Sequence, residues 1–233
     1  MNVPIYCYLD IETIPAGKME KVLYPKYPKL EDVKIGQRKG KVAESYRNER
    51  YPILIDEYNK TCKVLLEKEN EKYRKRALIS TQSEILCLAY AFDDEKIEVL
   101  TGSEERIIKQ FGEVLEQFGD KKYSITYVGH NIRDFDLKRL YHRAFLYDCE
   151  SLKDVFKFMP KDKVKDTMEI WGFHSYRDYT SLDEILTYFG LEGKKDIDGS
   201  MVFDYYIEGK LTEIYDYCKG DVDKVRKLFK ILL

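Results

Sequence analysis

The feature that most constrains the fold is an apolar run at residues 3–9, VPIYCYL, which ends at Asp10. Valine, isoleucine and tyrosine favour strands, and a run of them without charged interruptions predicts a buried strand. The backbone of such a strand needs neighbouring strands for its hydrogen bonds, and its faces need helices to cover them. The rest of the chain must therefore supply a sheet and its covering helices.

Later segments have the pattern of further strands. Residues 84–92 and 96–101 are rich in strand-favouring side chains and flank the turn-forming pair Asp93-Asp94. This arrangement predicts a β-hairpin. Residues 124–128 predict one more short strand.

Helical patterns separate and follow these strands. Apolar side chains recur at helical spacing in residues 103–118 and 212–233, and residues 134–147 predict another helix. Ser181 and Glu184 have the spacing of a capping box, at the start of a helix that we expect to end at Gly190. The order of elements predicts an α/β fold with a mixed sheet of about five strands flanked by helices.

Residues 15–80 differ from the rest of the chain because they are rich in lysine, glutamate, arginine and tyrosine. A structureless loop of this length is unusual in a compact domain, and residues 52–78 have the pattern of a charged amphipathic helix. We therefore predict a single domain, residues 1–233, with a mostly helical insertion at about 15–80 after the first strand. Six basic side chains of the insertion either guide a single strand or balance nearby glutamates: Lys60, Lys63, Lys72, Arg74, Lys75 and Arg76.

The composition limits the kinds of partner and compartment. The formal net charge is −2, so nucleic-acid binding would depend on local patches and bound metal rather than on overall charge. The five cysteines include no CxxC pair, which predicts reduced thiols rather than a disulfide framework or zinc site. The lack of a signal-peptide pattern and of a membrane-length apolar run predicts a cytoplasmic protein without membrane contact.

Asp10 and Glu12 are two residues apart at the end of the predicted first strand, so their side chains point to the same face. Adjacent carboxylates repel each other and raise each other's pKa, and a divalent cation relieves that repulsion. Mg²⁺ and Mn²⁺ prefer oxygen ligands of this kind. The pair predicts a metal site, although an isolated pair also occurs as a solvated strand end.

Two further segments carry acids. One contains Asp134 and Asp136; it follows a strand and opens a helix, a usual place for site residues in an α/β sheet. The other contains Tyr217 and Asp221, whose spacing of four places them on one face of the last helix. Each segment alone also has a structural interpretation, as a charge at a helix N-terminus or as a core tyrosine beside a surface aspartate.

Taken together, the acidic segments resemble the DEDD superfamily of ribonuclease-H-like 3′–5′ exonucleases, which includes polymerase proofreading domains. The first motif of that superfamily is DxE, which Asp10 and Glu12 match. The second motif has an asparagine followed by an aromatic residue and an aspartate, which Asn131, Phe135 and Asp136 match.

The third motif has a tyrosine or a histidine before the last aspartate. Tyr217 precedes Asp221 by four residues, so the chain resembles the tyrosine (DEDDy) branch. Within that branch, the stretches YLDIETIP, SLDEILTYFGL and YDYCKGDV are similar to predicted exonucleases related to the family-B polymerase proofreading domain. The resemblance covers the first strand and residues 80–233, and it leaves the insertion unexplained.

The resemblance implies a catalytic and metal-binding role for four acids and a tyrosine. Asp10, Glu12 and Asp221 would hold one Mg²⁺ or Mn²⁺ ion. Asp10 would bridge to a second ion, which Asp136 would support through water. Tyr217 would orient the attacking water, because a phenol with a free pKa of about 10 is a poor base at neutral pH.

Weaker candidates surround this set. Asn131 would hydrogen-bond the terminal nucleotide, and Phe135 would either stack against it or simply anchor its own helix. Lys194 and Lys195 would reach a phosphate if they are not simply solvated. Asp166 has the position of a structural residue.

We expect a stand-alone 3′–5′ exonuclease that acts on the 3′ end of single-stranded nucleic acid, with DNA favoured. Any polymerase or repair partner would then act in trans. One alternative is a 3′–5′ exoribonuclease, because the same acids serve both sugars. Another is a catalytically silent nucleic-acid binding module, which would have no need of all four acids and the tyrosine.

Overall fold

The computed structural model describes residues 5–173, 179–191, 193 and 197–233. The chain forms two compact units. The core unit comprises Met1–Ala16 and Arg76–Leu233, and the insertion unit comprises Gly17–Lys75. Lys194 and Lys195, which we considered as phosphate contacts, lie outside the described residues.

The core unit contains a five-stranded sheet. Its strands are β1 (Tyr6–Pro15), β2 (Ser83–Phe92), β3 (Glu98–Thr101), β4 (Thr126–Gly129) and β5 (Val164–Asp166). Their order in the sheet is β3-β2-β1-β4-β5. β2 is antiparallel to β1 and β3, whereas β4 is parallel to both β1 and β5. The predicted mixed α/β sheet and its hairpin are confirmed.

β1 is longer than the sequence pattern indicated. It continues through Asp10, where we ended the predicted strand, to Pro15. The reason is β2, which pairs with β1 from Cys7 onward and carries the backbone hydrogen bonding past the first-motif acids. On its other edge, β1 pairs with β4 only over Tyr6–Tyr8. Beyond Tyr8, this edge of β1 has no pairing with β4, so side chains must satisfy the backbone hydrogen-bonding groups beside the acids.

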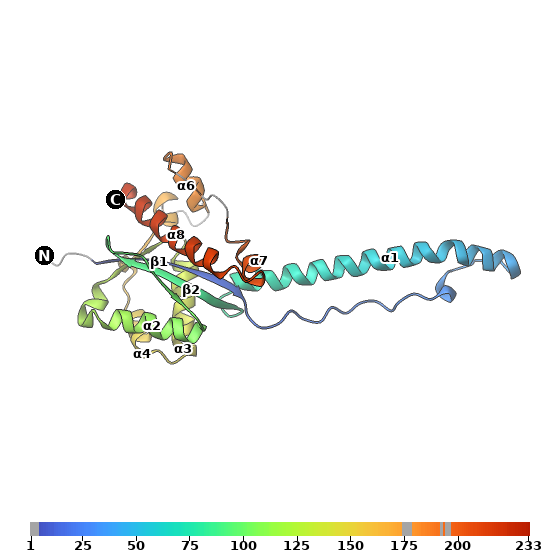
Figure 1. Ribbon diagram of the computed structural model, residues 1–233, viewed down its shortest axis with the longest axis horizontal. Helices are drawn as coiled ribbons and strands as arrows, with labels where there is room; N and C mark the ends of the chain where they lie inside the picture. Colours follow the sequence, from blue (N-terminus) through green and yellow to red (C-terminus); the bar gives the residue numbers. More distant parts are fainter. Residues whose placement is uncertain (1–4, 174–178, 192, 194–196) are drawn as a thin grey trace. The chain divides into compact units, whose positions relative to one another are not determined.

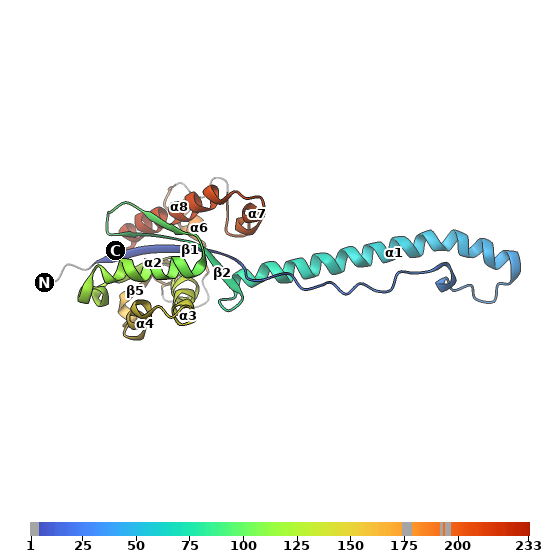
Figure 2. The same ribbon diagram turned by 60° about the horizontal axis from the view of Figure 1, so that its bottom comes forward.

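Helices cover both faces of the sheet (Figures 1 and 2). One face carries α2 (Glu104–Glu116), α3 (Lys138–Leu146) and α4 (Glu150–Lys157). The other carries α5 (Thr167–Trp171), α6 (Leu182–Tyr188), α7 (Val202–Ile207) and α8 (Leu211–Leu232). Short 3₁₀ turns connect these elements at η2 (Arg76–Leu78), η3 (Gly119–Ser124) and η5 (Lys161–Lys163).

The alternation of side chains along β1 assigns the first-motif acids to one face. Leu9 and Ile11 belong to the core that packs against α2, whereas Tyr8 belongs to the core that packs against α8. Successive residues of a strand point to opposite faces. Asp10 and Glu12 are in phase with Tyr8 and therefore face α8.

The helix predicted at residues 134–147 is two elements. The first is η4 (Arg133–Leu137), a single π-helical turn in which the Leu137 amide donates to the Ile132 carbonyl at 2.9 Å. The second is α3. Single π-helical turns are rare and occur frequently at functional sites. This turn buries Asp136 and leaves Asp134 exposed.

The capping prediction for α6 is confirmed. The Ser181 hydroxyl accepts a hydrogen bond from the Glu184 amide at 3.3 Å, and the Glu184 carboxylate accepts one from the Ser181 amide at 2.8 Å. Gly190 follows the helix with a φ of +69°, the left-handed conformation that glycine tolerates best. The helix is thus fixed at both ends beside the sheet.

The insertion unit contains η1 (Leu30–Asp32) and the long helix α1 (Gly40–Lys75). α1 begins well before Pro52, where we predicted its start. Half of residues 40–51 are lysine, alanine, glutamate or arginine, which are good helix formers. A proline inside a helix costs about 3 kcal/mol, and a long run of favourable residues on both sides offsets that cost.

The extended segment before η1 runs along α1. The Tyr73 hydroxyl donates to the Gly17 carbonyl at 2.7 Å, and the Tyr51 hydroxyl donates to the Pro28 carbonyl at 3.2 Å. Several basic side chains of α1 form ion pairs with acids of the same unit: Lys60–Asp56, Lys63–Glu67, Lys72–Glu20 and Lys75–Glu71. These four lysines thus have acidic neighbours within the insertion unit, and a strand-guiding role stays a prediction.

Among the described residues, none of the helices combines membrane-spanning length with sufficient hydrophobicity.

Candidate functional site

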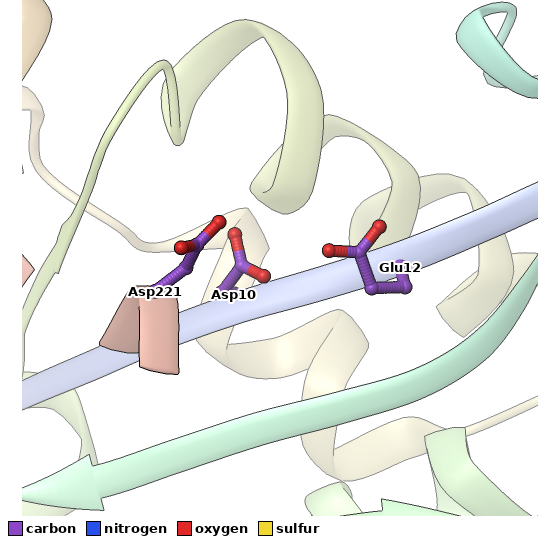
Figure 3. A group of neighbouring side chains, drawn as sticks. All are labelled: Asp10, Glu12 and Asp221. Atoms are coloured by element: carbon purple, nitrogen blue, oxygen red, sulfur yellow. The ribbon is translucent and has the colours of Figure 1, made fainter. Parts of the chain in front are cut away.

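Asp10 and Glu12 project from the same face of β1 (Figure 3). Their partners across the antiparallel pairing with β2 are Ala89 and Cys87. Directly opposed residues of a sheet share a face, and small side chains there leave room above the strand for the two carboxylates. Glu12 is buried, and Asp10 is partly exposed.

Asp221 approaches this face from α8. The apolar side chains of Cys218, Val222 and Val225 hold the helix against the sheet, and the Cys218 thiol donates to the Asp10 carbonyl at 3.4 Å. The helix turn then brings Asp221 beside Asp10 and Glu12 (Figure 3). One carboxylate oxygen from each of the three acids lies within 4.8 Å of the others.

Asp136 reaches the site from η4. Its Oδ1 atom accepts a hydrogen bond from the Ile11 backbone amide at 2.9 Å, and the side chain is buried. The β1–β4 pairing ends before Ile11, so Asp136 takes the place that a neighbouring strand would have taken. The contact connects the second acidic motif directly to the first. It also distinguishes Asp136 from the exposed Asp134, in agreement with the assignment of Asp136 to the second motif.

The electrostatics of these acids are those of crowded, desolvated carboxylates. Burial, and then the neighbouring Asp10, raise the pKa of Glu12 well above its ordinary value. The same two causes, in the same order, raise the pKa of Asp136. A divalent cation would compensate this negative charge, and the oxygen ligands are of the hard type that Mg²⁺ and Mn²⁺ prefer. The residues present therefore fit a divalent metal ion.

These raised pKa values predict how stability depends on pH in the absence of divalent metal. Above about pH 4 the unfolded chain ionises its carboxyl groups while folded Glu12 keeps its proton, so the folded state binds more protons. The free energy of unfolding should fall as pH rises, by up to about 1.4 kcal/mol per pH unit relative to Glu12→Gln. Urea unfolding in EDTA between pH 5 and 8 measures this difference. Parallel profiles for the two proteins would contradict it.

Tyr217 lies one turn before Asp221 on α8, on the same side of the helix. Burial, followed by the charges of Glu12 and Asp221, raises the pKa of Tyr217 far above its ordinary value. The side chain is therefore a neutral phenol at any physiological pH. It can donate and accept hydrogen bonds at the site, but it cannot act as an ionised base.

A cavity of about 310 Å³ adjoins the acids. It is lined by Asp10, Asp136 and Asp221 together with both predicted nucleotide contacts, Asn131 and Phe135. Glu12 and Tyr217 are absent from its lining, although Glu12 belongs to the three-carboxylate group. The Arg139 guanidinium lies 3.5 Å from the centre of the Phe135 ring, so one ring face already has a partner.

Asp166 fixes the loop that carries Asn131. Its carboxylate accepts hydrogen bonds from the backbone amides of Asn131, Arg133 and Met168, at 2.8, 3.2 and 3.0 Å. Asn131 has a φ of +57°, a left-handed conformation that asparagine adopts more readily than most residues. Asp166 thus has the structural role expected from its sequence position: it holds this loop at the cavity.

The cavity lining includes residues that the sequence patterns did not single out as site residues, notably His130, Tyr179 and Asp183. His130 bonds through its ring nitrogens to the Thr167 hydroxyl and the Thr180 carbonyl, at 2.9 and 3.0 Å. Asp183 follows the Ser181 cap, where an acid also has a purely helical explanation. The available sequence signals were the short distance of Tyr179 and Asp183 from the α6 cap and the position of His130 next to Asn131.

Comparison with known proteins supports the fold. The chain is similar to the family B DNA polymerase from the hyperthermophilic archaeon Pyrobaculum calidifontis, with 14% sequence identity and a TM-score of 0.51. The match covers 99% of this chain and 24% of the polymerase chain. At this identity the likeness concerns the fold alone, and it confirms the predicted ribonuclease-H-like sheet.

Comparison of sequences identifies the family. No curated protein sequence matches the chain significantly. Residues 82–229 match the family described as predicted 3′-5′ exonucleases related to the exonuclease domain of PolB. This segment contains β2 to β5, the second and third acidic motifs and most of α8. The chain therefore belongs to the family of predicted 3′-5′ exonucleases related to the exonuclease domain of PolB.

Proposed function

We propose that this protein is a metal-dependent 3′–5′ exonuclease that removes nucleotides from the end of a single strand, with DNA favoured. The observation that carries the proposal is the convergence of Asp10, Glu12 and Asp221, with oxygens within 4.8 Å of one another, beside a cavity that Asp136 also lines. Family membership supplies the reaction class. We further propose that residues 1–233 form one exonuclease domain interrupted by the insertion unit.

The acids of the site would hold two divalent ions, Mg²⁺ or Mn²⁺. Asp10, Glu12 and Asp221 are the ligands proposed for one ion, while Asp10 would also bind the second and Asp136 would support it through water. Such ions activate water and neutralise charge on the phosphate and the departing oxygen. The protein's own contribution is to fix the ligands, exclude bulk water and orient the strand.

Two other groups would position the reactants. Tyr217 keeps its proton, so we propose that its hydroxyl orients the attacking water rather than deprotonating it. Asn131 and Phe135 line the cavity and would contact the terminal nucleotide. A cavity of about 310 Å³ is near the lower end of the range for ligand pockets, which suits one nucleotide. A duplex would first have to unpair its end.

The test is digestion of a single strand labelled at its 3′ or 5′ end, on DNA and on RNA, with Mn²⁺ or with EDTA. The proposal expects immediate loss of a 3′ label, stepwise shortening of a 5′-labelled strand, and no reaction in EDTA. Faster digestion of RNA would favour the exoribonuclease alternative. Binding without digestion would favour the silent module. A polymerase or repair protein remains the proposed kind of partner in trans.

Replacing Tyr217 by phenylalanine isolates the role of its hydroxyl. Tyr217→Phe keeps the ring and its packing, so Mn²⁺ binding by the carboxylates should survive. Turnover should fall by on the order of tenfold to a thousandfold, the range for loss of one positioning or proton-handling group. Single-turnover digestion and calorimetric Mn²⁺ titration measure the two effects. Loss of metal binding in Tyr217→Phe would instead make the tyrosine a structural residue.

Tyr179 is the most exposed aromatic side chain of the cavity lining, at 74% exposure. We expect it to stack on a base of the bound strand, an interaction worth about 1–3 kcal/mol per base. Tyr179→Ala should therefore raise KM about five- to a hundredfold with little change in kcat. Tyr188 is the matched control, because it is also 74% exposed but packs on Trp171, with ring centres 5.2 Å apart. Equal changes in KM for Tyr179→Ala and Tyr188→Ala would exclude a stacking role for Tyr179.

A further inference from the structure

Lys224 is a cation placed between two acids of the candidate site. Its Nζ atom lies 3.1 Å from Asp221 Oδ1 and 3.7 Å from Asp183 Oδ1. The three side chains are largely shielded from solvent, with exposures of 19% for Lys224, 11% for Asp221 and 26% for Asp183. An ion pair in such surroundings is screened much less than one on the surface.

The two acids come from different helices that meet at the cavity. Asp221 and Lys224 are one turn apart on α8, whereas Asp183 lies in the first turn of α6. Both Asp183 and Asp221 line the cavity of about 310 Å³. Lys224 therefore has one acceptor that belongs to the three-carboxylate group and a second acceptor outside that group.

A lysine ammonium and a divalent ion have conflicting demands on the same carboxylate. Both need oxygen lone pairs of Asp221, and two cations held within a few ångströms of each other repel strongly in a shielded site. Since the Lys224 stem is flexible, a small rotation can exchange the acceptor at 3.1 Å for the one at 3.7 Å. If Lys224 pairs with Asp183 instead, the Asp221 carboxylate is available to bind the metal ion.

We propose that Lys224 competes with the catalytic metal ion for Asp221, and that Asp183 receives Lys224 when the metal binds. This inference rests on the proposed function. It makes Lys224 and Asp183 positioning residues that set the metal concentration at which the site fills. Asp183 acts through Lys224 rather than as a ligand of its own.

The test measures Mn²⁺ binding to the full chain by calorimetry, without nucleic acid. Lys224→Met removes the competing cation and should lower the Mn²⁺ dissociation constant about tenfold. Lys224→Arg keeps the charge and should bind Mn²⁺ more weakly than Lys224→Met. Lys227→Met is the matched control, because Lys227 pairs with Asp223 on the same helix, at 2.7 Å, and is 62% exposed. Its dissociation constant should equal that of the unaltered chain.

A double variant separates the indirect role of Asp183 from simple attraction to the metal. Asp183→Asn alone should weaken Mn²⁺ binding, because it removes the negative charge of Asp183 and leaves Asp221 as the acidic partner of Lys224 among the described residues. The same change in the Lys224→Met background should have no effect. An equal loss in both backgrounds, or unchanged affinity in Lys224→Met, overturns the inference and leaves the proposed function intact. Absence of Mn²⁺ binding by the unaltered chain overturns both the inference and the proposed function.

Discussion

Asp10→Ala is expected to abolish exonuclease activity while the chain remains folded. Asp10 is the proposed ligand of both ions, and metal-ion catalysis contributes several kcal/mol to stabilising the transition state. Turnover should therefore fall by on the order of a thousandfold or more, as measured by release of a 3′-terminal nucleotide in Mn²⁺.

The stability of Asp10→Ala should change in the opposite direction. After burial, the charge of Asp10 is the next cause that raises the pKa of both Glu12 and Asp136, so negative charges on these three carboxyl groups would oppose one another in the fold. Removing one of them should raise the melting temperature of the protein in EDTA. Near-normal turnover of Asp10→Ala in Mg²⁺ would refute the two-metal mechanism.

Asp136 is expected to combine a catalytic and a structural role, which two substitutions separate. Both Asp136→Ala and Asp136→Asn should reduce turnover by on the order of a hundredfold or more, because neither supplies the charge that supports the second ion. Their stabilities should differ. Asparagine can still accept the hydrogen bond from the Ile11 amide, whereas alanine leaves that buried donor without its acceptor.

Leaving a buried donor unsatisfied costs about 1–3 kcal/mol, so Asp136→Asn should be more stable than Asp136→Ala by that amount in urea unfolding. Asp134→Ala is the matched control: this acid lies on the same π-helical turn but is exposed. Its stability should remain within about 0.5 kcal/mol of the unaltered chain, and its turnover should be unchanged. Equal stability of the two Asp136 variants would show that the contact with Ile11 contributes little.

The sequence was most informative where a local pattern also determines local structure. The hairpin at Asp93-Asp94 and the cap at Ser181 depend on neighbouring residues, and both formed as expected. The end of β1 depends instead on pairing with β2, which begins about seventy residues later in the chain and cannot be inferred from local propensity. We predicted the start of α1 at Pro52, and thus too late, because proline is common at the first position of a helix.

The site likewise combines features that depend on local sequence with features that depend on long-range packing. The motif spacing selected Asp136 over Asp134, and the structure buries Asp136 and exposes Asp134. The contact between Asp136 and the Ile11 amide could not be foreseen, since it depends on where β4 stops. Lys224 and Asp183 are ordinary helix charges in the sequence. Only the packing of α6 against α8 brings them together.

The contact of Cys218 with Asp10 joins the first strand to the last helix, across 208 residues of sequence. A site whose ligands are so far apart cannot assemble until synthesis of the chain has passed Asp221, which supplies the third carboxylate. Until α8 folds onto the sheet, Asp10 and Glu12 lack the third carboxylate of their group. Nascent chains shorter than residue 221, and chains in which α8 has not packed on the sheet, would therefore lack the proposed metal site.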